Sequence, residues 1–543
     1  MTSGSRRLPQ LAAFLGAVGV LALVAGSGSA WAQSSATAAK PRGTVRVAYV
    51  DFGRDLLSPL GVVRMGTRGY GEALYDPLVG VNADGSTNFN NGLLTRIETS
   101  DAQFYTLALR QGVKFHDGTD LTAEDVKWTM DYIVETKDVG GQSAIYLRAN
   151  LDKVEVIDAH TLKVSLKRKD VEFPTMIAPV ESDLVIYPKA YFLKATDSGF
   201  EKKPVGSGPW KFSKRQLGEY IEYEANENYW NKARVPGFKT LRLELVPDIT
   251  SRKAKLRAGE IDLIQINPSD APQMEKDGFR IVGPRYTAYP MVNFMQSGDT
   301  AFLTNKLDFR KAIVLAVDMP AVVKGFYPPG TAEPTTGTPG FSPVTMGYDA
   351  SLPAYKYDPE ESKRLLKSAG YNGELVSFYN MAGFPGAPEM PEVNVAIANY
   401  LRQVGLNVKL IDVDFTTFSP SRRVVDPPAA LIQTGAQPRP SLLGNIRVYM
   451  LAKSDGGAVA AASEAAKIKT AYDRISAIVD VKERDNALRA FGKDLYNDYW
   501  AMPVVWRHGG WAASKRIAGW EPVNGTSDYL RFDTLKPSES VRN

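Results

Sequence analysis

The sequence predicts an α/β protein of two lobes, and three observations support this fold class. The chain has 543 residues, which exceeds what one hydrophobic core usually organises. Residues 374–415 follow the order strand, helix, strand, and residues 241–264 follow the same order far upstream. Two such units so far apart indicate two separate lobes, each with a mixed sheet flanked by helices.

The downstream unit is the clearer of the two. Its strand, helix and strand are expected at 375–379, 393–404 and 408–415, with Gly405 ending the helix. Because a helix joins them, the two strands must be parallel neighbours in one sheet. Such a sheet places ligand crevices at the carboxyl ends of its strands. The upstream unit has its strand, helix and apolar strand at 241–246, 249–258 and 261–264.

The sequence predicts the first residues of two helices from their N-terminal capping residues. Asp358 stands at an N-cap position, with Pro359 at N1 and Glu361 at N3, and Gly370 ends that helix. Its buried face is expected to contain Leu365, Leu366 and Ala369. Thr122 opens a second helix with a weaker capping box. The apolar stripe of that helix consists of Val126, Met130, Ile133 and Val134.

The N-terminus predicts a signal peptide. Arg6 and Arg7 precede an apolar run at 11–25, and Ala30-Trp31-Ala32 fits a small-x-small cleavage site, so we expect cleavage after Ala32 and a periplasmic location. A membrane anchor is the alternative, but this run is shorter than the roughly 20 residues that span a bilayer. The arginine pair resembles the twin-arginine signal while Pro9 departs from it, which leaves the export route open.

Composition excludes several classes of function. The chain has no cysteine, so it has no disulfide, no thiolate metal site and no cysteine nucleophile. It also has no cysteine for a lipid anchor, which favours retention in a Gram-negative periplasm. Without residues 1–32 the chain has 63 basic and 60 acidic residues, a net charge of +3. This balance gives no reason to expect nucleic acid or stable membrane insertion.

Seven blocks of sequence, in order along the chain, resemble the extracellular solute-binding proteins of family 5. Residues 104–134, FYTLALRQGVKFHDGTDLTAEDVKWTMDYIV, resemble the signature block of that family. The other blocks are 70–79 (YGEALYDPLV), 204–230 (PVGSGPWKF to NENYW), 256–264, 293–323, 357–371 and 489–520. The family includes the periplasmic oligopeptide, dipeptide and nickel-binding receptors of ABC importers.

This resemblance implies a two-lobed periplasmic-binding-protein fold, type II, of the large subclass with an extra subdomain. Lobe I would comprise 33–287 with a return at 505–543, the subdomain 72–205, and lobe II 288–504. The chain would cross between the lobes at 289–294 and 501–506. The implied function is a monomeric receptor, not an enzyme, that closes over a small-molecule ligand and delivers it to ABC permease subunits with their ATPases.

The loop after a lobe II strand gives the main indication about the ligand. In peptide-binding members this loop has a Gly-Trp segment and then an aspartate that binds the ligand's amino terminus. Here the aspartate is missing, and Arg439 stands near its place. An arginine favours a carboxylate, phosphate or sulfate. The hypothesis is therefore a ligand that lacks a free amino terminus or has an anionic group near Arg439. The alternative is that Arg439 faces solvent or pairs with a neighbouring acid.

The candidate ligand-binding residues fall in two groups. The loop group is Thr434, Gly435, Gln437 and Arg439, and the free amides at the start of a helix expected at 441–451 would support it. The aromatic group, placed near strand ends or hinge segments, is Phe52, Tyr286 and Trp506. Packing in a core is the alternative for each aromatic residue.

Other functions have weaker support. The only histidines, His116, His160 and His508, are not clustered, so we expect no metal and no cofactor, and His116 precedes an Asp-Gly turn. An exported hydrolase and a chaperone-like binder are the competing classes. The available carboxylate pairs belong to that turn and to a helix start. Peptides, opines and glycosides all stay open as ligands.

Overall fold

The computed structural model describes residues 40–53, 55–58, 68–295, 302–382, 387, 389–414, 430–436, 439, 441–451, 465–526 and 529–542. The chain divides into two units, Met1–Ala39 and Lys40–Asn543, and all described residues belong to the second. The predicted signal peptide and its cleavage site after Ala32 lie outside the described residues. Within the part that is described, no helix has the length and apolar character needed to cross a membrane.

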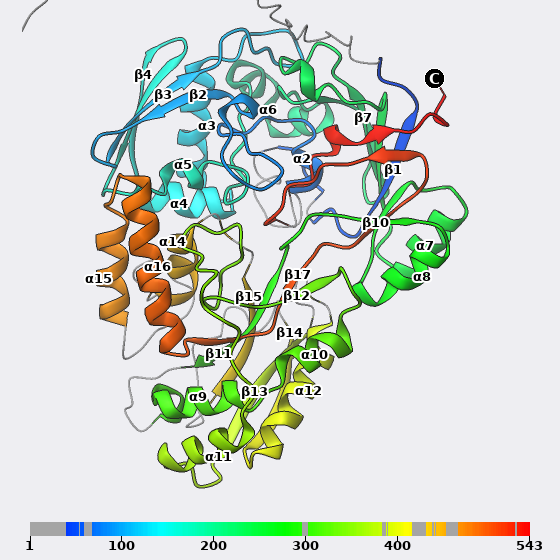
Figure 1. Ribbon diagram of the computed structural model, residues 1–543. Coiled ribbons are helices and arrows are strands. Elements are labelled where there is room, and N and C mark those ends of the chain that lie inside the picture. The colour runs from blue at the N-terminus through cyan, green and yellow to red at the C-terminus, as the bar shows by residue number, and fades with distance from the viewer. Residues whose placement is uncertain are drawn as a thin grey trace, which may run out of the picture. The chain divides into compact units, whose positions relative to one another are not determined.

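A seven-stranded sheet forms the centre of lobe I (Figure 1). Its strand order is β10-β18-β9-β1-β8-β7-β6. The strands are β1 (Thr44–Tyr49), β6 (Trp210–Gln216), β7 (Tyr220–Ala225), β8 (Thr240–Leu245), β9 (Leu263–Gln265), β10 (Arg280–Val282) and β18 (Trp511–Ala513). The last of these comes from the C-terminal part of the chain, which therefore returns to lobe I and completes its sheet.

The upstream strand-helix-strand unit is β8, α7 (Ile249–Arg257) and β9. Val47 of β1 pairs in parallel with Leu243 of β8 on one side and with Leu263 of β9 on the other. The two strands of the unit are thus parallel, with β1 between them. Alternate side chains of β1, Val45 and Val47, are completely buried in the lobe I core. The short helix α8 (Ala271–Lys276) follows β9.

A four-stranded antiparallel sheet builds the extra subdomain. Its order is β2-β3-β5-β4, and the strands are β2 (Leu94–Glu98), β3 (Phe104–Leu109), β4 (Leu151–Asp158) and β5 (Thr161–Leu166). The helices of this region are α3 (Ala123–Glu135), α4 (Gln142–Asn150), α5 (Phe173–Met176) and α6 (Lys189–Lys202). Helix α3 begins with the predicted capping box at Thr122, and Val126, Met130 and Ile133 are buried.

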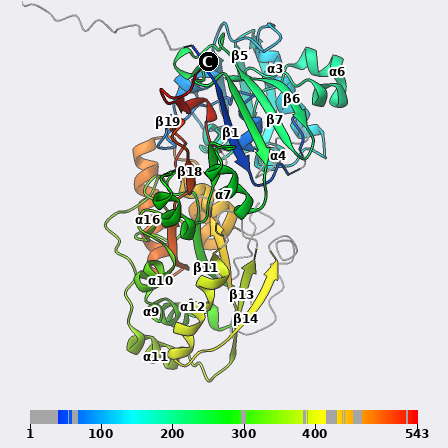
Figure 2. The ribbon, with the colours of Figure 1, turned by 90° about the vertical axis from the view of Figure 1, so that its right-hand side faces the viewer.

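A five-stranded sheet forms lobe II, in the order β14-β13-β15-β11-β16. Its strands are β11 (Tyr289–Met295), β13 (Leu375–Ala382), β14 (Asn407–Asp414), β15 (Ala430–Ala436) and β16 (Ala501–Pro503). The predicted pairing is confirmed, since β13 and β14 are parallel neighbours joined through α12 (Met390–Gln403). Figure 2 shows α12 beside these two strands, with α9 (Leu307–Leu315) and α11 (Pro359–Ser368) close by.

The start of α11 confirms the cap predicted for it. The Asp358 carboxylate accepts a hydrogen bond of 3.0 Å from the backbone N–H of Glu361. Leu365 and Leu366 are buried against lobe II, as their spacing indicates. Gly370 follows with a φ of +74°, a conformation that glycine adopts without strain.

Two antiparallel strands connect the lobes. Strand β11 leads into lobe II and pairs with β16, and β17 (Val505–Arg507), which pairs with β12 (Ala332–Pro334), leads back out. The family resemblance implied crossings at 289–294 and 501–506, and the apolar, strand-like composition of both segments fits that expectation. The exact limits proposed for the lobes, 33–287, 288–504 and 505–543, stay predictions.

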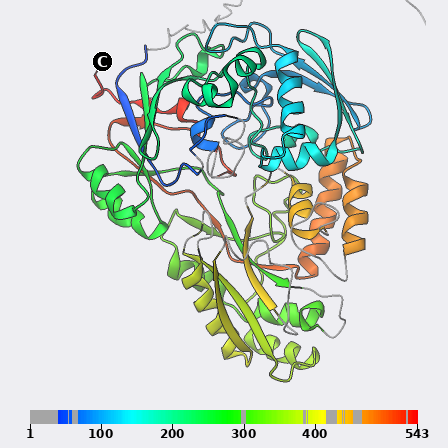
Figure 3. The same cartoon turned by 180° about the vertical axis from the view of Figure 1, so that it is seen from behind.

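The subdomain also contacts lobe II directly. Helices α15 (Ala465–Ile475) and α16 (Val481–Asn497) lie next to the subdomain in Figures 1 and 3. The backbone N–H of Val171 donates to the Ser476 carbonyl just after α15, at 3.1 Å. Beside them, the expected helix at 441–451 consists of α14 (Leu442–Asn445) and a π-helical turn, Ile446–Met450. Lobe II thus meets lobe I both at the crossings and at the subdomain.

Candidate functional site

Two of the blocks that carry the family resemblance, 70–79 and 204–230, meet at Asp76. Its carboxylate is buried and accepts hydrogen bonds from Tyr229 Oη at 2.6 Å, Trp230 Nε1 at 2.9 Å and Ser207 Oγ at 3.0 Å. Burial raises the pKa of Asp76 above its ordinary value. We call these four residues the Asp76 cluster. The cluster ties three segments of lobe I together, because Ser207 comes from the glycine loop while Tyr229 and Trp230 are neighbours after β7.

His116 joins a further block, 104–134, to the block 204–230. Its backbone N–H donates to the Gly206 carbonyl at 2.7 Å, and its Nδ1 accepts from the Gly206 N–H at 3.2 Å. Its Nε2 lies 3.0 Å from the Gly208 carbonyl, which assigns the proton to Nε2. Burial lowers the pKa of His116 to about 4, so the ring is neutral. The histidine thus positions the glycine loop at 206–208, beside the Asp117-Gly118 turn.

Two of the predicted aromatic residues come together at the crossing between the lobes. The rings of Tyr286 and Trp506 lie edge to face, with centroids 5.9 Å apart, and the His508 ring is 5.2 Å from Tyr286. Trp506 is buried and its Nε1 donates to the Phe341 carbonyl. Tyr286 has a φ of +55°, and its hydroxyl lies 3.3 Å from a carboxylate oxygen of Glu333. The crossing therefore contains a connected aromatic and polar group.

Phe52 lies elsewhere, in the core of lobe I. Its ring is buried and packs against Tyr49 at 5.7 Å and Tyr70 at 5.5 Å between centroids. The structure thus gives Phe52 the packing that was its alternative interpretation. A ligand-stacking role for Phe52 stays a prediction.

Arg439 is the loop residue whose surroundings the structure describes best. It is buried, and its guanidinium forms an ion pair with the Glu181 carboxylate. Glu181 lies in the subdomain, between α5 and α6, so the contact joins the two lobes. We call this contact the interlobe ion pair. Pairing with an acid was one of the two alternatives that the sequence left open, although the acid is 258 residues away.

The other residues of the loop group are described less fully. Thr434 and Gly435 lie in β15, where they pair with Met291 and Pro290 of the crossing strand β11. Gln437 lies outside the described residues. The first amides of α14 do not form a free anion site, because those of Leu442, Leu443 and Gly444 already donate to other groups. Their acceptors are the Met346 carbonyl, Ser441 Oγ and the Ser441 carbonyl, respectively.

A second contact of lobe II with the subdomain, and the backbone of α14, lie in the same region of the chain as the interlobe ion pair. The Arg447 guanidinium lies 5.4 Å from the centroid of the Tyr146 ring in the subdomain, within cation–π range. A Cβ added at Gly444 would lie 2.9 Å from Arg439 Cδ and 3.3 Å from Glu181 Oε1. The ion pair therefore rests against the backbone of α14, and a side chain at position 444 would displace it.

Three residues of these contacts carry no signal that local sequence patterns identified: Glu181, Glu333 and Gly444. Glu181 gives no local signal, because the chain has 60 acidic residues and nothing near position 181 indicates which arginine it meets. A buried arginine does require a counter-charge, so the need for an acid was predictable while its position was not. Gly444 lies in a predicted helix, where a glycine costs helix stability and indicates a packing constraint.

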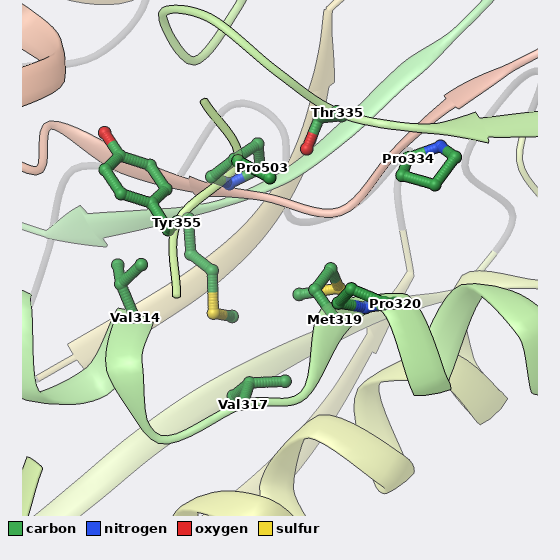
Figure 4. A pocket seen from close by; sticks show the side chains of 10 residues that line it. Val314, Val317, Met319, Pro320, Pro334, Thr335, Tyr355 and Pro503 are labelled. Carbon is green, nitrogen blue, oxygen red and sulfur yellow. The ribbon is translucent and has the colours of Figure 1, made fainter. Parts of the chain in front are cut away.

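A separate apolar pocket lies within lobe II (Figure 4). It lies between α9, α10 (Met319–Phe326), β12 and β16, and none of the predicted ligand-binding residues lines it. Its walls include Val314, Val317, Met319, Pro334, Tyr355 and Pro503. No group of three or more His, Asp or Glu side chains within the described ranges is arranged to hold a metal ion. The expectation that the protein binds no metal stays a prediction.

Comparison with known sequences gives a consistent result. The family model for bacterial extracellular solute-binding proteins, family 5 (Middle), matches residues 88–444. Heme-binding protein A of Haemophilus influenzae is 31% identical over 328 residues, covering 54% of this chain and 56% of that relative. The dipeptide-binding protein of Escherichia coli is 28% identical over 316 residues, covering 55% and 58%. The chain thus spans less than two thirds of the length of these curated relatives.

Comparison with solved structures supports the same fold. HbpA2 from Haemophilus parasuis has a TM-score of 0.78 at 23% identity, with 91% of this chain and 100% of that chain covered. AgaA from A. tumefaciens R10, in complex with agropinic acid, has a TM-score of 0.72 at 23% identity, with 92% and 100% covered. The predicted two-lobed periplasmic-binding-protein fold is confirmed by these neighbours. The chain belongs to the bacterial extracellular solute-binding proteins, family 5.

Proposed function

We propose that this protein is the substrate-binding component of an ABC importer, which closes over a small solute and delivers it to the permease subunits. The observation that supports this most is the connection of two α/β lobes through the antiparallel crossing strands β11 and β16. Such a connection lets the lobes rotate as rigid bodies while the strands absorb the change. A solute that contacts both lobes then favours the closed form.

The proposed ligand lacks a free amino terminus or has an anionic group that reaches Arg439. Relatives are named for heme and for dipeptides, and one structural neighbour holds agropinic acid, so the family name alone does not choose a ligand. The loop after β15 has an arginine near the place where, by resemblance, peptide-binding members have an aspartate. A guanidinium repels an ammonium group and binds a carboxylate through two parallel hydrogen bonds.

The proposed site combines this loop with the aromatic group at the crossing. Thr434, Gly435, Gln437 and Arg439 would come from lobe II. Tyr286, just before β11, and Trp506, in β17, would come from the crossing, with Phe52 as the lobe I candidate. We propose binding without chemical change, since the relatives are named as binding proteins. A hydrolase would instead convert the bound compound.

Native mass spectrometry of gently purified protein tests the binding function. We expect one retained small molecule per chain, released unchanged on denaturation, and a smaller radius of gyration when that molecule is added back to stripped protein. A chemically altered compound after incubation would contradict the receptor function. Suppressed aggregation of unrelated proteins with no retained solute would favour a chaperone-like binder.

Two further measurements test location and partners. The protein is proposed to be a periplasmic monomer, cleaved after Ala32, so N-terminal sequencing of the periplasmic fraction is expected to begin at Gln33. Deletion of the permease that the receptor serves should abolish uptake of the retained compound while leaving binding intact. Uptake that persists without the permease would contradict the transport function.

A further inference from the structure

Both members of the interlobe ion pair are charged and buried. Arg439 is 8% exposed and Glu181 is 4% exposed. One charge belongs to lobe II and the other to the subdomain of lobe I. Separation of the lobes would therefore expose both charges to water, whereas closure removes both from it.

First, the Glu181 carboxylate lies at the guanidinium to which the proposed function assigns an anionic group of the ligand. Arg439 follows β15, on the loop where the proposed function places an anionic group of the ligand. In this structure the group at that guanidinium is a carboxylate of the protein itself. Glu181 therefore occupies the place that a ligand carboxylate would take, and it shows that a planar carboxylate fits there.

The second step is that the bonds of Glu181 are incomplete. Among the described residues, none donates a hydrogen bond to its Oε1, which is fully buried. The Asp76 carboxylate, which is equally buried, uses both of its oxygens. Glu181 is not alone in this, since Glu389 Oε2 also has no hydrogen-bond donor among the described residues. What the bonding of Glu181 shows is that the Arg439 guanidinium is the group that holds its carboxylate, so a ligand that takes over the guanidinium releases it.

The third step is the space at Gly444. A methyl group at this position would lie only 2.9 Å from Arg439 Cδ, so the arginine side chain or α14 would have to shift to accommodate it. Glycine in a helix lowers helix stability relative to alanine. The chain thus uses a residue that weakens α14 in order to seat the guanidinium at the lobe interface.

We propose that Glu181 is a specificity-determining residue that competes with the ligand for Arg439. A solute bearing a carboxylate displaces Glu181 from the guanidinium and takes over its ion pair. A solute without an anionic group forms no new ion pair with Arg439, so nothing offsets the free energy lost when Glu181 is displaced. This inference rests on the proposed solute-binding function and deepens it, since it names carboxylate-bearing solutes as the ligand class. The exchange of Glu181 for the solute carboxylate involves no covalent bond.

A closure latch that has no contact with ligand is the competing explanation. In a latch the two residues act together, so neutralising either one opens the lobes and shifts solute affinity in the same direction. In a competition they act against each other, because Glu181 blocks the site and Arg439 forms it. The sign of the two effects therefore separates the explanations.

Isothermal titration with three matched probes tests the proposal. The probes are N-acetyl-alanyl-alanine, which has a carboxylate and no ammonium, alanyl-alanine amide, which has the reverse, and alanyl-alanine, which has both. We expect Glu181→Gln to tighten binding of the N-acetyl probe about tenfold or more and Arg439→Gln to weaken it by a similar factor. The amide probe should respond to neither substitution.

A matched control comes from a second buried ion pair, Arg234 with Asp533, at 2.9 Å within lobe I. Asp533→Asn also leaves a buried arginine without its carboxylate but lies away from the interlobe ion pair, so its affinity for the N-acetyl probe should equal that of the wild type. If Glu181→Gln folds poorly, the double variant Glu181→Gln/Arg439→Gln removes both charges and should bind the N-acetyl probe as weakly as Arg439→Gln. Thermal unfolding checks that each variant is folded.

Three outcomes would overturn the proposal. Changes of the same sign in the two single variants would show a latch. Unchanged affinity in both would remove the ion pair from ligand recognition, and failure of the Glu181→Gln protein to bind the N-acetyl probe would show that Arg439 receives no carboxylate. In each case a retained solute in native mass spectrometry would leave the solute-binding function intact, and its absence would count against that function separately.

Discussion

The Asp76 cluster and the interlobe ion pair are two buried carboxylate sites with opposite properties. Asp76 lies within lobe I and accepts three hydrogen bonds of 2.6 to 3.0 Å from neutral donors. Glu181 lies between the lobes and bonds to one cation, with an oxygen that no described residue satisfies. The first site is complete without a ligand, and the second is not.

In this chain the residues that stabilise the fold and the residue at the proposed ligand site are different ones. Asp76, Ser207, Tyr229 and Trp230 belong to the blocks that resemble the family, and their contacts stabilise lobe I. Arg439 stands where the sequence departs from the pattern of peptide-binding members, and its contact joins the lobes. The residues that identify the family are thus structural, while the residue that departs from it lies at the proposed ligand site.

Replacing the central carboxylate of the Asp76 cluster is expected to have the largest effect. Asp76→Ala leaves two buried donors, Ser207 and Tyr229, and the partly buried Trp230 without their acceptor, so the free energy of unfolding should fall by about 3–5 kcal/mol. Urea unfolding followed by circular dichroism measures this. Tyr229→Phe, which removes a single donor, is the control and should cost about 1 kcal/mol. A folded Asp76→Ala protein with strongly altered solute affinity would contradict the assignment of a purely structural role to the Asp76 cluster.

The second prediction concerns pH and an acid close to the lobe interface. Burial, and secondly the Asp170 carboxylate, raises the pKa of Glu172 from 4.5 to about 7. The other charged groups that act on it are Arg484, Glu181 and Arg447. Because the folded protein holds this proton more tightly than the unfolded chain, the free energy of unfolding falls as pH rises from about 4.5 to about 7. The expected loss is about 1–3 kcal/mol.

Glu172→Gln should remove this dependence, because glutamine stays neutral. The variant is expected to gain stability relative to the wild type at pH 8 and to match it near pH 4.5, as measured by urea unfolding at the two pH values. If the difference in the free energy of unfolding between the variant and the wild type is the same at both pH values, Glu172 titrates in the folded protein as it does in the unfolded chain. The interlobe region would then be better hydrated than its burial indicates.

The sequence predicted local structure and the order of elements well. The Asp358 cap, the Thr122 capping box and the parallel pair β13 and β14 were all readable, because their signals lie within a few residues or follow from one crossover rule. The insertion of β1 between β8 and β9 was not, because nothing in a strand's own residues states which distant strand it joins.

The candidate site was predictable only in part. Arg439 was found because it departs from a family pattern, and Tyr286 and Trp506 because they flank apolar crossing segments. Glu181 is 258 residues from its partner, and an isolated acid in a loop usually indicates a solvated side chain. Contacts between lobes depend on how two separately folded bodies meet, which local pattern does not encode.

The third prediction sharpens the role of the interlobe ion pair without altering a charge. Gly444→Ala places a methyl group 2.9 Å from Arg439 Cδ and should push the guanidinium away from its position. We expect affinity for N-acetyl-alanyl-alanine to fall about tenfold, equivalent to about 1.4 kcal/mol. Gly325→Ala in α10 is the matched control, because a Cβ there meets nothing within 4 Å. Equal affinities in the two variants would show that the position of Arg439 does not matter for binding.

The smallest effect is expected at a site that belongs to neither region. Asp358 caps α11 through a hydrogen bond of 3.0 Å to the Glu361 N–H, far from the lobe interface in sequence and within lobe II. Asp358→Ala removes this acceptor and should lower the free energy of unfolding by about 1 kcal/mol, while Asp358→Ser keeps a capping oxygen and should recover most of it. Because α11 packs on α9 rather than on the crossing strands, solute affinity and the radius of gyration should not change. A shift in solute affinity on Asp358→Ala would mean that any loss of stability in lobe II weakens the closed form. The affinity changes measured for the Arg439 variants would then include this general effect.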